Sequence, residues 1–330
     1  MKVQELRQLL SSADRVCLEK ALLECYKQLK KDQKEDFDPS LTDILTGKMT
    51  EKKKVEKKVD FADLEQEIET FIENAYAQNY CAPNRVVPKS QRPKWRFMVK
   101  NFIKELDKIP LENENYEKAA KLLFDLYRLI CYACNCYLFS TDDPFRSIGW
   151  EQPQLFALVV QKTFAAGYTR EKMVQLLASA VDSGLSRESL HIEQEMVLIS
   201  QLNTADAQRM ALEELEKLVK TKKKDLKGLG KYDNKRFHLE TVINEMCGVV
   251  LTIAVCLEEA DRGIAFYFEN STEKDKEIAL YCALHRLDMM EENDLWLKVY
   301  EMGIKQKIQP RENLVRAYEY RKKQSGLTRE

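Results

Sequence analysis

Three cysteines lie close together near the middle of the chain, at positions 131, 134 and 136. Cysteine thiolates bind zinc and iron, and two cysteines three residues apart share one face of a helix. On a continuous helix Cys136 lies about 140° around the axis from Cys131, so one ion reaches all three only if the helix ends there. A fourth ligand, such as Cys81, would have to come from far along the chain. We therefore interpret Cys131, Cys134 and Cys136 as buried structural thiols, keep them as alternative metal ligands, and predict no cofactor.

A second group of residues suited to binding lies between positions 89 and 100, where five cations are interleaved with two aromatic residues. Lysine and arginine neutralise phosphates and aromatic rings stack on bases, so this composition is typical of a surface for an anionic partner. It also suits the start of an amphipathic helix whose aromatic and aliphatic residues face the core while the cations stay in water. The partner-binding candidates here are Arg92, Lys94, Trp95, Arg96 and Lys100.

The segment 180–190 resembles the central turn of a DNA-binding helix-turn-helix, with a glycine at position 184 in the turn. Glu193 departs from that pattern, which requires an apolar residue there. Residues 191–195 would also present an acidic face, which opposes contact with phosphates. A junction between two capped helices explains the same residues, and we favour it. The residues expected on the inner face of the second helix are Leu190, Met196 and Val197.

The chain shows none of the common catalytic motifs. Residues 228–232 lack the upstream glycine and the Ser or Thr after lysine that a phosphate-binding loop requires. There is neither a Gly-x-Ser-x-Gly nor a His-Glu-x-x-His motif, and three histidines leave few groups for acid–base chemistry. These residues, His191, His238 and His285, are each 47 positions apart, but the windows around them share little else. We predict that the protein is not an enzyme.

Similar helix junctions recur in the central part of the chain. The segments 167–173 and 184–190 both read Gly, a large apolar residue, Thr or Ser, Arg and Glu, and they start seventeen residues apart. In each, glycine can end a helix in the left-handed conformation, and Thr169 or Ser186 can cap the next one. Gly149 fits a third junction of this kind. A helix and turn of this length is half of a hairpin of about 34 residues, so unit length and junction resemble those of tetratricopeptide-type arrays.

The shared arginines of these junctions, Arg170 and Arg187, have no part in ending or capping a helix. On equivalent turns they would lie on the same edge of the array. We therefore predict that both guanidinium groups contact a partner.

Composition favours a helical protein in a reducing compartment. Glycine and proline number only 10 and 8 in 330 residues, which disfavours all-β folds and glycine-rich nucleotide loops. A net charge of −1 with 32% charged residues indicates a solvated helical surface rather than a polyanion binder overall. Nine cysteines, many in apolar helical segments, indicate free thiols. The N-terminus lacks the apolar stretch of a signal peptide, and the longest apolar run, 246–257, is too short to cross a bilayer. We predict a cytoplasmic protein without a membrane partner.

Apolar spacing and charge divide the chain into five parts. They are an N-terminal helical segment at 1–31, a charged linker at 32–59, a helical array at 60–224, a basic loop at 225–235 and C-terminal helical hairpins at 236–330. Ser12 is expected to cap the second N-terminal helix. The C-terminal helices are expected at about 236–259, 273–287, 293–303 and 310–324.

The predicted fold is therefore all-α: a right-handed α–α superhelix, or an irregular array of TPR-like hairpins, with a small helical N-terminal segment. Solenoids of this kind usually present a surface to a macromolecule. We predict a non-catalytic cytosolic scaffold or adaptor that binds a protein or peptide, with its oligomeric state left open. The alternative is a nucleic-acid-binding or regulatory protein that uses the basic and aromatic segment 89–100.

Overall fold

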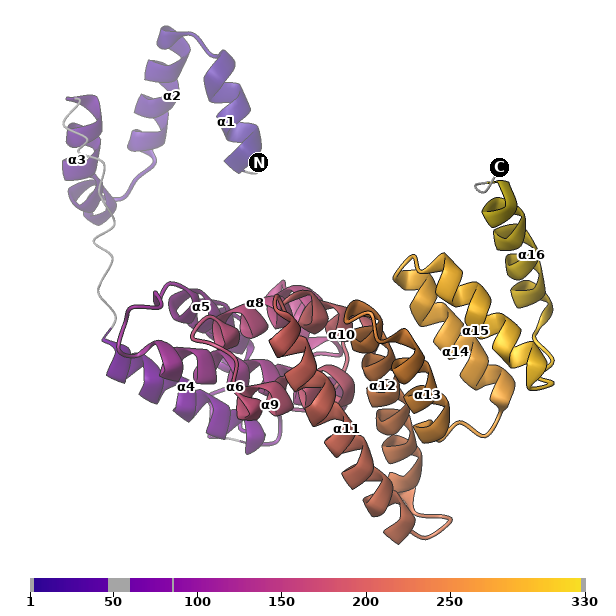
Figure 1. Ribbon diagram of the computed structural model, residues 1–330. Coiled ribbons are helices and arrows are strands. Elements are labelled where there is room, and N and C mark those ends of the chain that lie inside the picture. Colours follow the sequence, from indigo (N-terminus) through magenta and orange to yellow (C-terminus); the bar gives the residue numbers. More distant parts are fainter. Residues whose placement is uncertain (1–2, 47–59, 85, 328–330) are drawn as a thin grey trace. The chain divides into compact units, whose positions relative to one another are not determined.

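The structure, a computed structural model, describes residues 3–46, 60–84 and 86–327 (Figure 1). Within these ranges the chain consists of helices and connecting turns without a strand, which confirms the all-α prediction. The chain divides between Val59 and Asp60 into an N-terminal and a C-terminal unit.

The N-terminal unit contains α1 (Val3–Ser12), α2 (Arg15–Lys27) and α3 (Lys31–Leu45). Our prediction that Ser12 caps the second helix is wrong, because Ser12 is the last residue of α1. Asp14 caps α2 instead, and its carboxylate accepts a hydrogen bond from the Cys17 amide at 2.7 Å. The Tyr26 hydroxyl joins α2 to α3 by donating a hydrogen bond to the Asp38 carboxylate at 2.6 Å. None of the described side chains in this unit is buried.

Helix α3 lies where we predicted a charged linker. Phe37, Leu41 and Ile44 recur at intervals of four and three residues, which is the spacing of one helix face, and the charged residues between them do not prevent the helix. The rest of the predicted linker, residues 47–59, lies outside the described residues.

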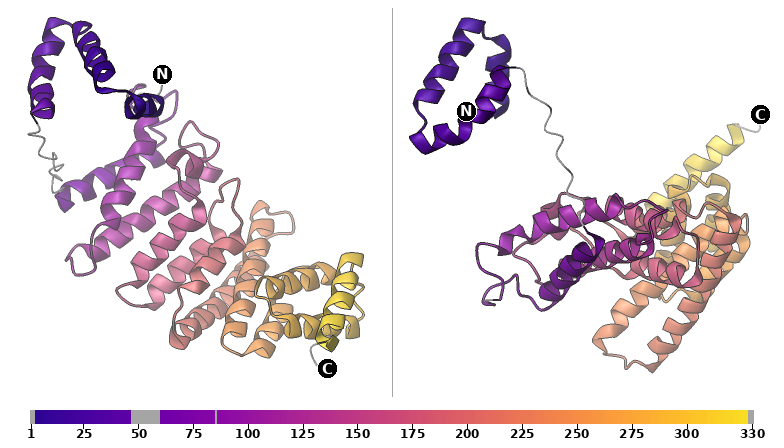
Figure 2. Two further views of the ribbon diagram at one scale, coloured as in Figure 1. Left: turned by 90° about the horizontal axis from the view of Figure 1, so that it is seen from above. Right: turned by 90° about the vertical axis from the view of Figure 1, so that its left-hand side faces the viewer.

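The C-terminal unit is an array of helices in sequence order, shown side by side in the left view of Figure 2. Its elements are α4 (Phe61–Tyr76), the 3₁₀ turn η1 (Arg92–Lys94), α5 (Trp95–Asp107), α6 (Tyr116–Asn135), α7 (Pro144–Ile148), α8 (Gln152–Phe164), α9 (Arg170–Asp182), α10 (His191–Ser200), α11 (Ala205–Gly228), α12 (Asn234–Cys256), α13 (Ala260–Asn270), α14 (Lys276–Met289), α15 (Asn293–Lys305) and α16 (Glu312–Leu327).

Neighbouring helices of this unit pack in a regular succession. Helix α4 packs on α6, α6 on α8, α8 on α10, and α9 on both α10 and α11. Helix α12 contacts α11, α13 and α14, and α15 and α16 follow. This is the helical-hairpin array that the sequence predicts, while a right-handed superhelix of the tetratricopeptide type stays a prediction.

Two of the three predicted junctions form as expected, and the third does not. Gly149 and Gly167 adopt left-handed backbone angles (φ 65° and 106°), and the Thr169 hydroxyl caps α9 by accepting from the Lys172 amide. Gly184 does not adopt this conformation, and Ser186 caps no helix. Helix α10 begins only at His191, after a turn over 183–190, so the helix-turn-helix geometry is absent as well.

The predicted basic loop at 225–235 is wrong in its bounds. Helix α11 runs to Gly228, so the predicted boundary at 224 falls inside it, and α12 begins at Asn234. Val219 and Leu226 extend the inner face of α11 past the lysines at 220–224, which explains why the helix continues. The four predicted C-terminal helices are present with shifted ends, and α13 is one that we did not predict.

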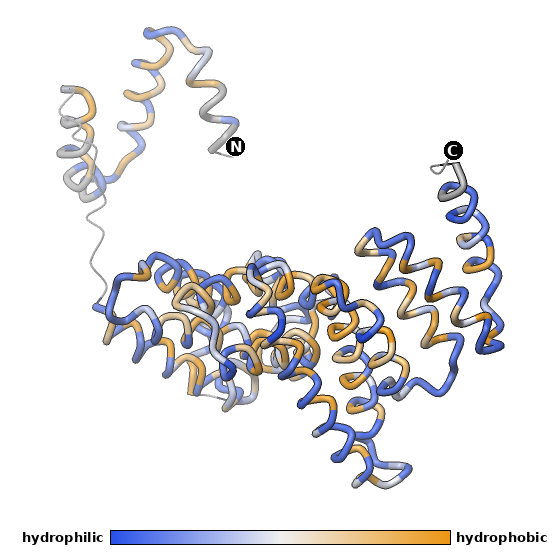
Figure 3. Tube along the Cα trace, in the orientation of Figure 1, coloured by the Kyte–Doolittle hydropathy of each residue, from blue (hydrophilic) through white to orange (hydrophobic). Residues whose placement is uncertain are grey.

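Helix α12 contains a long apolar stretch (Figure 3). Its length and composition would allow it to cross a membrane, and no other helix within the described residues passes the same test. However, 67% of its most apolar stretch is buried inside the protein, under α11, α13 and α14. Contact with helices on several sides explains an apolar surface all round.

The inner face of α10 differs from the predicted one. Its buried residues are Gln194, Glu195, Leu198 and Ile199, whereas Leu190 is 62% exposed and Met196 and Val197 are half-buried. The predicted acidic outer face is therefore wrong, because Glu195 points into the core.

Glu195 takes part in a buried polar cluster that joins three helices. Arg286 of α14 donates hydrogen bonds to the carboxyl group of Glu195 on α10 at 2.5 Å and to that of Glu245 on α12 at 2.6 Å. Arg286 is 7% exposed and Glu195 is fully buried. The guanidinium lies against Gly248 of α12, where any Cβ would overlap its nitrogen and carbon atoms. Arg286 thus connects α10, which precedes the long α11, to α12 and α14, which follow it.

We expect Gly248→Ala to lower the free energy of unfolding, because Arg286 must move away from the carboxyl groups of Glu195 and Glu245. Displacing a buried charged pair costs roughly 3–5 kcal/mol. Gly228→Ala is the matched control, since Gly228 is also helical and has no atom within 4 Å of the added Cβ. That control should raise stability by about 0.5–1 kcal/mol. Urea unfolding of both variants measures the difference, and equal stabilities would contradict the packing role of Gly248.

We expect Glu195 to make the free energy of unfolding depend on pH. Burial raises the pKa of this carboxyl to about 8 from its ordinary 4.5, and Glu245 adds to the effect while Arg286 opposes it. The folded state therefore holds a proton that the unfolded state releases, so this contribution is complete below pH 4.5 and is lost as pH rises through 8. We expect Glu195→Gln to flatten the decline in unfolding free energy between pH 5 and 8 that wild type shows. The free energy of unfolding is measured against pH for both proteins by urea unfolding. If it changes with pH in the same way in wild type and in Glu195→Gln, Glu195 is not protonated in the folded state.

Candidate binding pocket

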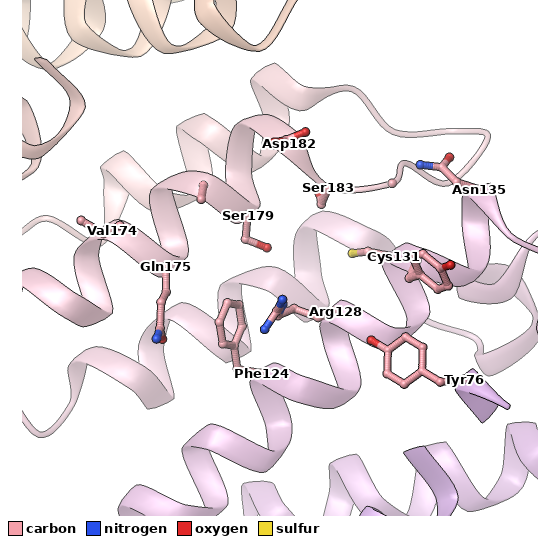
Figure 4. A pocket seen from close by; sticks show the side chains of 13 residues that line it. Tyr76, Phe124, Arg128, Cys131, Asn135, Val174, Gln175, Ser179, Asp182 and Ser183 are labelled. Atoms are coloured by element: carbon pink, nitrogen blue, oxygen red, sulfur yellow. The ribbon is translucent and has the colours of Figure 1, made fainter. Parts of the chain in front are cut away.

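A pocket of about 490 Å³ opens between helices α4, α6 and α9 (Figure 4). We call it the α4–α6–α9 pocket. Tyr76 contributes its ring from the last turn of α4, and Phe124, Arg128, Tyr132 and Asn135 come from successive turns of α6. The opposite wall is α9 and the turn after it. The residues of that wall are Val174, Gln175, Ala178, Ser179, Asp182, Ser183 and Gly184.

Arg128 is the central charged group of this pocket. Its side chain is exposed, and its guanidinium lies over the Phe124 ring, 5.8 Å from the ring centre, a contact that favours this position of the cation. Among the described residues it forms no ion pair, although Asp125 lies three residues earlier on α6. Figure 4 shows the guanidinium, the Tyr76 hydroxyl and the Ser179 hydroxyl directed into the space between α6 and α9.

The other charged residue of the lining, Asp182, already has two partners in the array. His238 Nε2 lies 2.8 Å from one of its carboxylate oxygens and Lys222 Nζ lies 3.6 Å from the other. These two partners come from α12 and α11. The remaining polar groups of the pocket are amides, hydroxyls and the Cys131 thiol, so Arg128 is the charged residue of the lining that has no ion pair among the described residues.

A buried hydrogen-bond network lies behind the Gly184 end of the pocket and holds the turn after α9 in place. The Gln152 side chain donates to the Gly184 carbonyl at 2.9 Å and accepts from the Ser186 amide at 2.8 Å. Gly184 lies so close to the Cys131 carbonyl that a Cβ would overlap it. Glycine is therefore needed at 184 for a close approach of two backbones, and not for the left-handed cap that we predicted.

The cysteine cluster has the character of structural thiols. Burial raises the pKa of Cys131 and of Cys134 to about 12, which disfavours the thiolates that a metal or a nucleophile requires. The Cys134 thiol donates to the Ile130 carbonyl, and Cys81 donates to the Tyr137 carbonyl instead of approaching the cluster. Helix α6 ends before Cys136, yet no group of three His, Cys, Asp or Glu in the described part of the chain is placed to hold a metal.

The basic and aromatic segment separates into buried and exposed residues. Trp95 is buried and stacks on Phe139 with 4.0 Å between ring centres, so it offers no face to a base. Arg92 donates to the carbonyls of Asn84 and Val87 and fixes the loop before α5. The candidates that remain exposed and without an ion pair in the described residues are Lys94, Arg96 and Lys100.

Arg170 and Arg187 do not form the common edge that we predicted. Arg170 at the start of α9 pairs with Glu213 and Glu214 of α11, so it joins two helices of the array. Arg187 lies in the turn over 183–190 and pairs with Asp142 at 3.0 Å, with both side chains mostly exposed. Arg170 and Arg187 have different surroundings because the junction at 184–190 does not form the predicted helix cap.

A second pocket, of about 340 Å³, lies among α10, α12, α13 and α14. His191 and His285 both line it, beside Glu245, Glu273 and the edge of Arg286. Two of the three evenly spaced histidines are thus neighbours in space, while His238 pairs with Asp182. The carboxylates of this second pocket already accept hydrogen bonds within the protein: Glu245 accepts from Arg286, and Glu273 accepts from the Asp275 amide.

Sequence reasoning missed Arg128, Tyr76, Gln175 and Ser179. A signal for Arg128 exists, because it is a cation in the half of α6 that is otherwise apolar almost all round. Tyr76, Gln175 and Ser179 carry no such signal, since each reads as an ordinary surface residue of an amphipathic helix. The chain matches no family model, no curated protein and no solved structure in the three comparisons that we made.

Proposed function

We propose that this protein is a non-catalytic cytoplasmic scaffold or adaptor whose helical array binds a segment of another protein. The observation that carries this proposal is the α4–α6–α9 pocket, which is built from helices of consecutive hairpins and in which polar side chains converge beside aromatic ones. Pockets of roughly 300–1,000 Å³ with a few converging polar groups are typical binding sites.

The chemistry of the pocket also supports binding rather than catalysis. Its thiol, Cys131, is buried and has a raised pKa, and its carboxylate, Asp182, already contacts Lys222 and His238. Neither is poised as a nucleophile or a general base. Arrays of helical hairpins present extended surfaces of this kind to macromolecules.

The proposal is tested with a photo-crosslinking amino acid in the full-length protein at Gln175, an exposed residue on the pocket wall. The matched control carries the same amino acid at Asp294, an exposed residue of α15. In cells that express the protein naturally, we expect the same polypeptide to be crosslinked at Gln175 in every replicate and not at Asp294. Crosslinks that are absent, or equal at the two positions, would overturn the proposal.

A second candidate function, nucleic-acid binding, is favoured by one observation. Lys94, Arg96 and Lys100 are exposed near the start of α5, and the exposed Phe97 ring lies under Arg96. The lysines at 220–224, which could extend such a surface, lie on α11, away from α5 in both Figure 1 and Figure 2. Lys222 and Lys223 are moreover bonded to Asp182 and Asn270.

If this second function holds, changing Lys94, Arg96 and Lys100 to glutamate should abolish salt-dependent retention on heparin. Each lost contact between a cation and an anionic group lowers the slope of log affinity against log salt concentration by about one. Reversing Lys220, Lys224 and Lys227, which are equally exposed on α11, is the matched control and should leave retention in place. Equal losses in the two variants would indicate unspecific charge attraction and would exclude a site on α5.

A further inference from the structure

The α4–α6–α9 pocket has an unbalanced charge inside an otherwise neutral polar lining. Asp182 at one end already has two partners, Lys222 and His238. Arg128 at the centre is exposed, lies over the Phe124 ring and has no ion pair with any described residue, although Asp125 of the same helix acts on it electrostatically. An occupant that supplies a negative charge at Arg128 would complete the electrostatics of the pocket.

The groups around Arg128 are suited to a carboxylate. A guanidinium binds a carboxylate through two parallel hydrogen bonds, and such charge-assisted pairs are among the strongest polar contacts in proteins. Tyr76 and Ser179 carry hydroxyls on either side of the guanidinium, and Gln175 carries an amide that can donate a further hydrogen bond (Figure 4).

The pocket also continues into a partly exposed aromatic surface. Tyr76 is 48% exposed and Tyr132 is 47% exposed, and their ring centres lie 5.5 Å apart. A small carboxylic acid would leave these rings uncovered, whereas a polypeptide would cover them with the side chains next to its acidic residue. Tyrosine and arginine are the residue types that most often dominate protein–protein binding energy.

The geometry points to an acidic protein segment as the occupant: the pocket holds a carboxylate of the partner at Arg128, with an apolar or aromatic neighbour of that residue against Tyr76 and Tyr132. The carboxylate belongs to an Asp or Glu side chain or to the C-terminus of the partner. This inference rests on the proposed binding of a protein segment by the same pocket.

The experiment selects peptides with the full-length protein from two random dodecapeptide libraries, one displayed internally and one with a free C-terminus. The best peptides are then synthesised and their affinities measured by fluorescence anisotropy. We expect them to share one acidic residue or a required C-terminal carboxylate. Replacing that residue by its amide should weaken binding at least about tenfold, as should Arg128→Gln in the protein. Combining the two changes should cost no more than either alone.

Two further variants separate charge from structure. Arg128→Lys keeps the charge without the two-pronged geometry and should retain part of the affinity. Arg146→Gln removes an exposed arginine of α7 that does not line the pocket, and it should leave affinity unchanged. Thermal unfolding of each variant must match wild type, and it should, because Arg128 forms no ion pair with the described residues whose loss would destabilise the fold.

The outcomes distinguish the inference from the function on which it rests. Peptides that crosslink to position 175 but respond to Arg128→Gln by less than about threefold would overturn the carboxylate site and leave the protein-binding function standing. Enrichment of basic peptides would do the same. If no peptide binds the full-length protein at the pocket, both the carboxylate site and the proposed function fail.

Discussion

The connection between the hairpins before the long α11 and those after it includes Arg286, a buried cation that lies between the carboxyl groups of Glu195 and Glu245. Glu195 on α10 belongs to the hairpins that precede the long α11, and Glu245 on α12 belongs to those that follow it. Charges are costly inside a protein unless they are paired, so this contact fixes the rotation of α14 against α10 and α12 much more strictly than apolar packing would. Gly248 is part of the same constraint, because only a residue without a side chain leaves space for the guanidinium. The two halves of the array therefore keep one relative placement.

The α4–α6–α9 pocket exists because a second constraint holds the turn after α9 close to α6. Gln152 bonds both Gly184 and Ser186, and the backbone at Gly184 contacts the Cys131 carbonyl. At this end α6 and α9 are held close, and toward the earlier turns of α9 they leave the space that Arg128 and its neighbours line. Rigid walls of this kind keep the pocket side chains in place before a partner arrives, which lowers the entropy cost of binding.

The sequence predicts what depends on local chemistry and fails where distant residues decide. Gly167 and Thr169 end and cap helices as predicted, since these roles involve neighbours within a few positions. Gly184 and Ser186 have the same pattern, but Gln152, more than thirty positions away, bonds their backbone and delays the next helix to His191. Glu195 looked like a surface residue because its partner, Arg286, is 91 positions away. Arg128 was equally hard to identify, since the pocket around it is formed by side chains from three helices.

The long α11–α12 hairpin extends beyond the rest of its unit (Figure 1). From Lys224 to Phe237 none of its side chains is buried, and Arg236 closes the turn by donating to the carbonyls of Leu226, Leu229 and Gly230. These hydrogen bonds from Arg236 hold the turn between the two helices in shape. Residues can be added to or removed from this tip at little expense to the packed array, so it is the place where a fluorescent tag or an inserted domain would report on the protein without disturbing it.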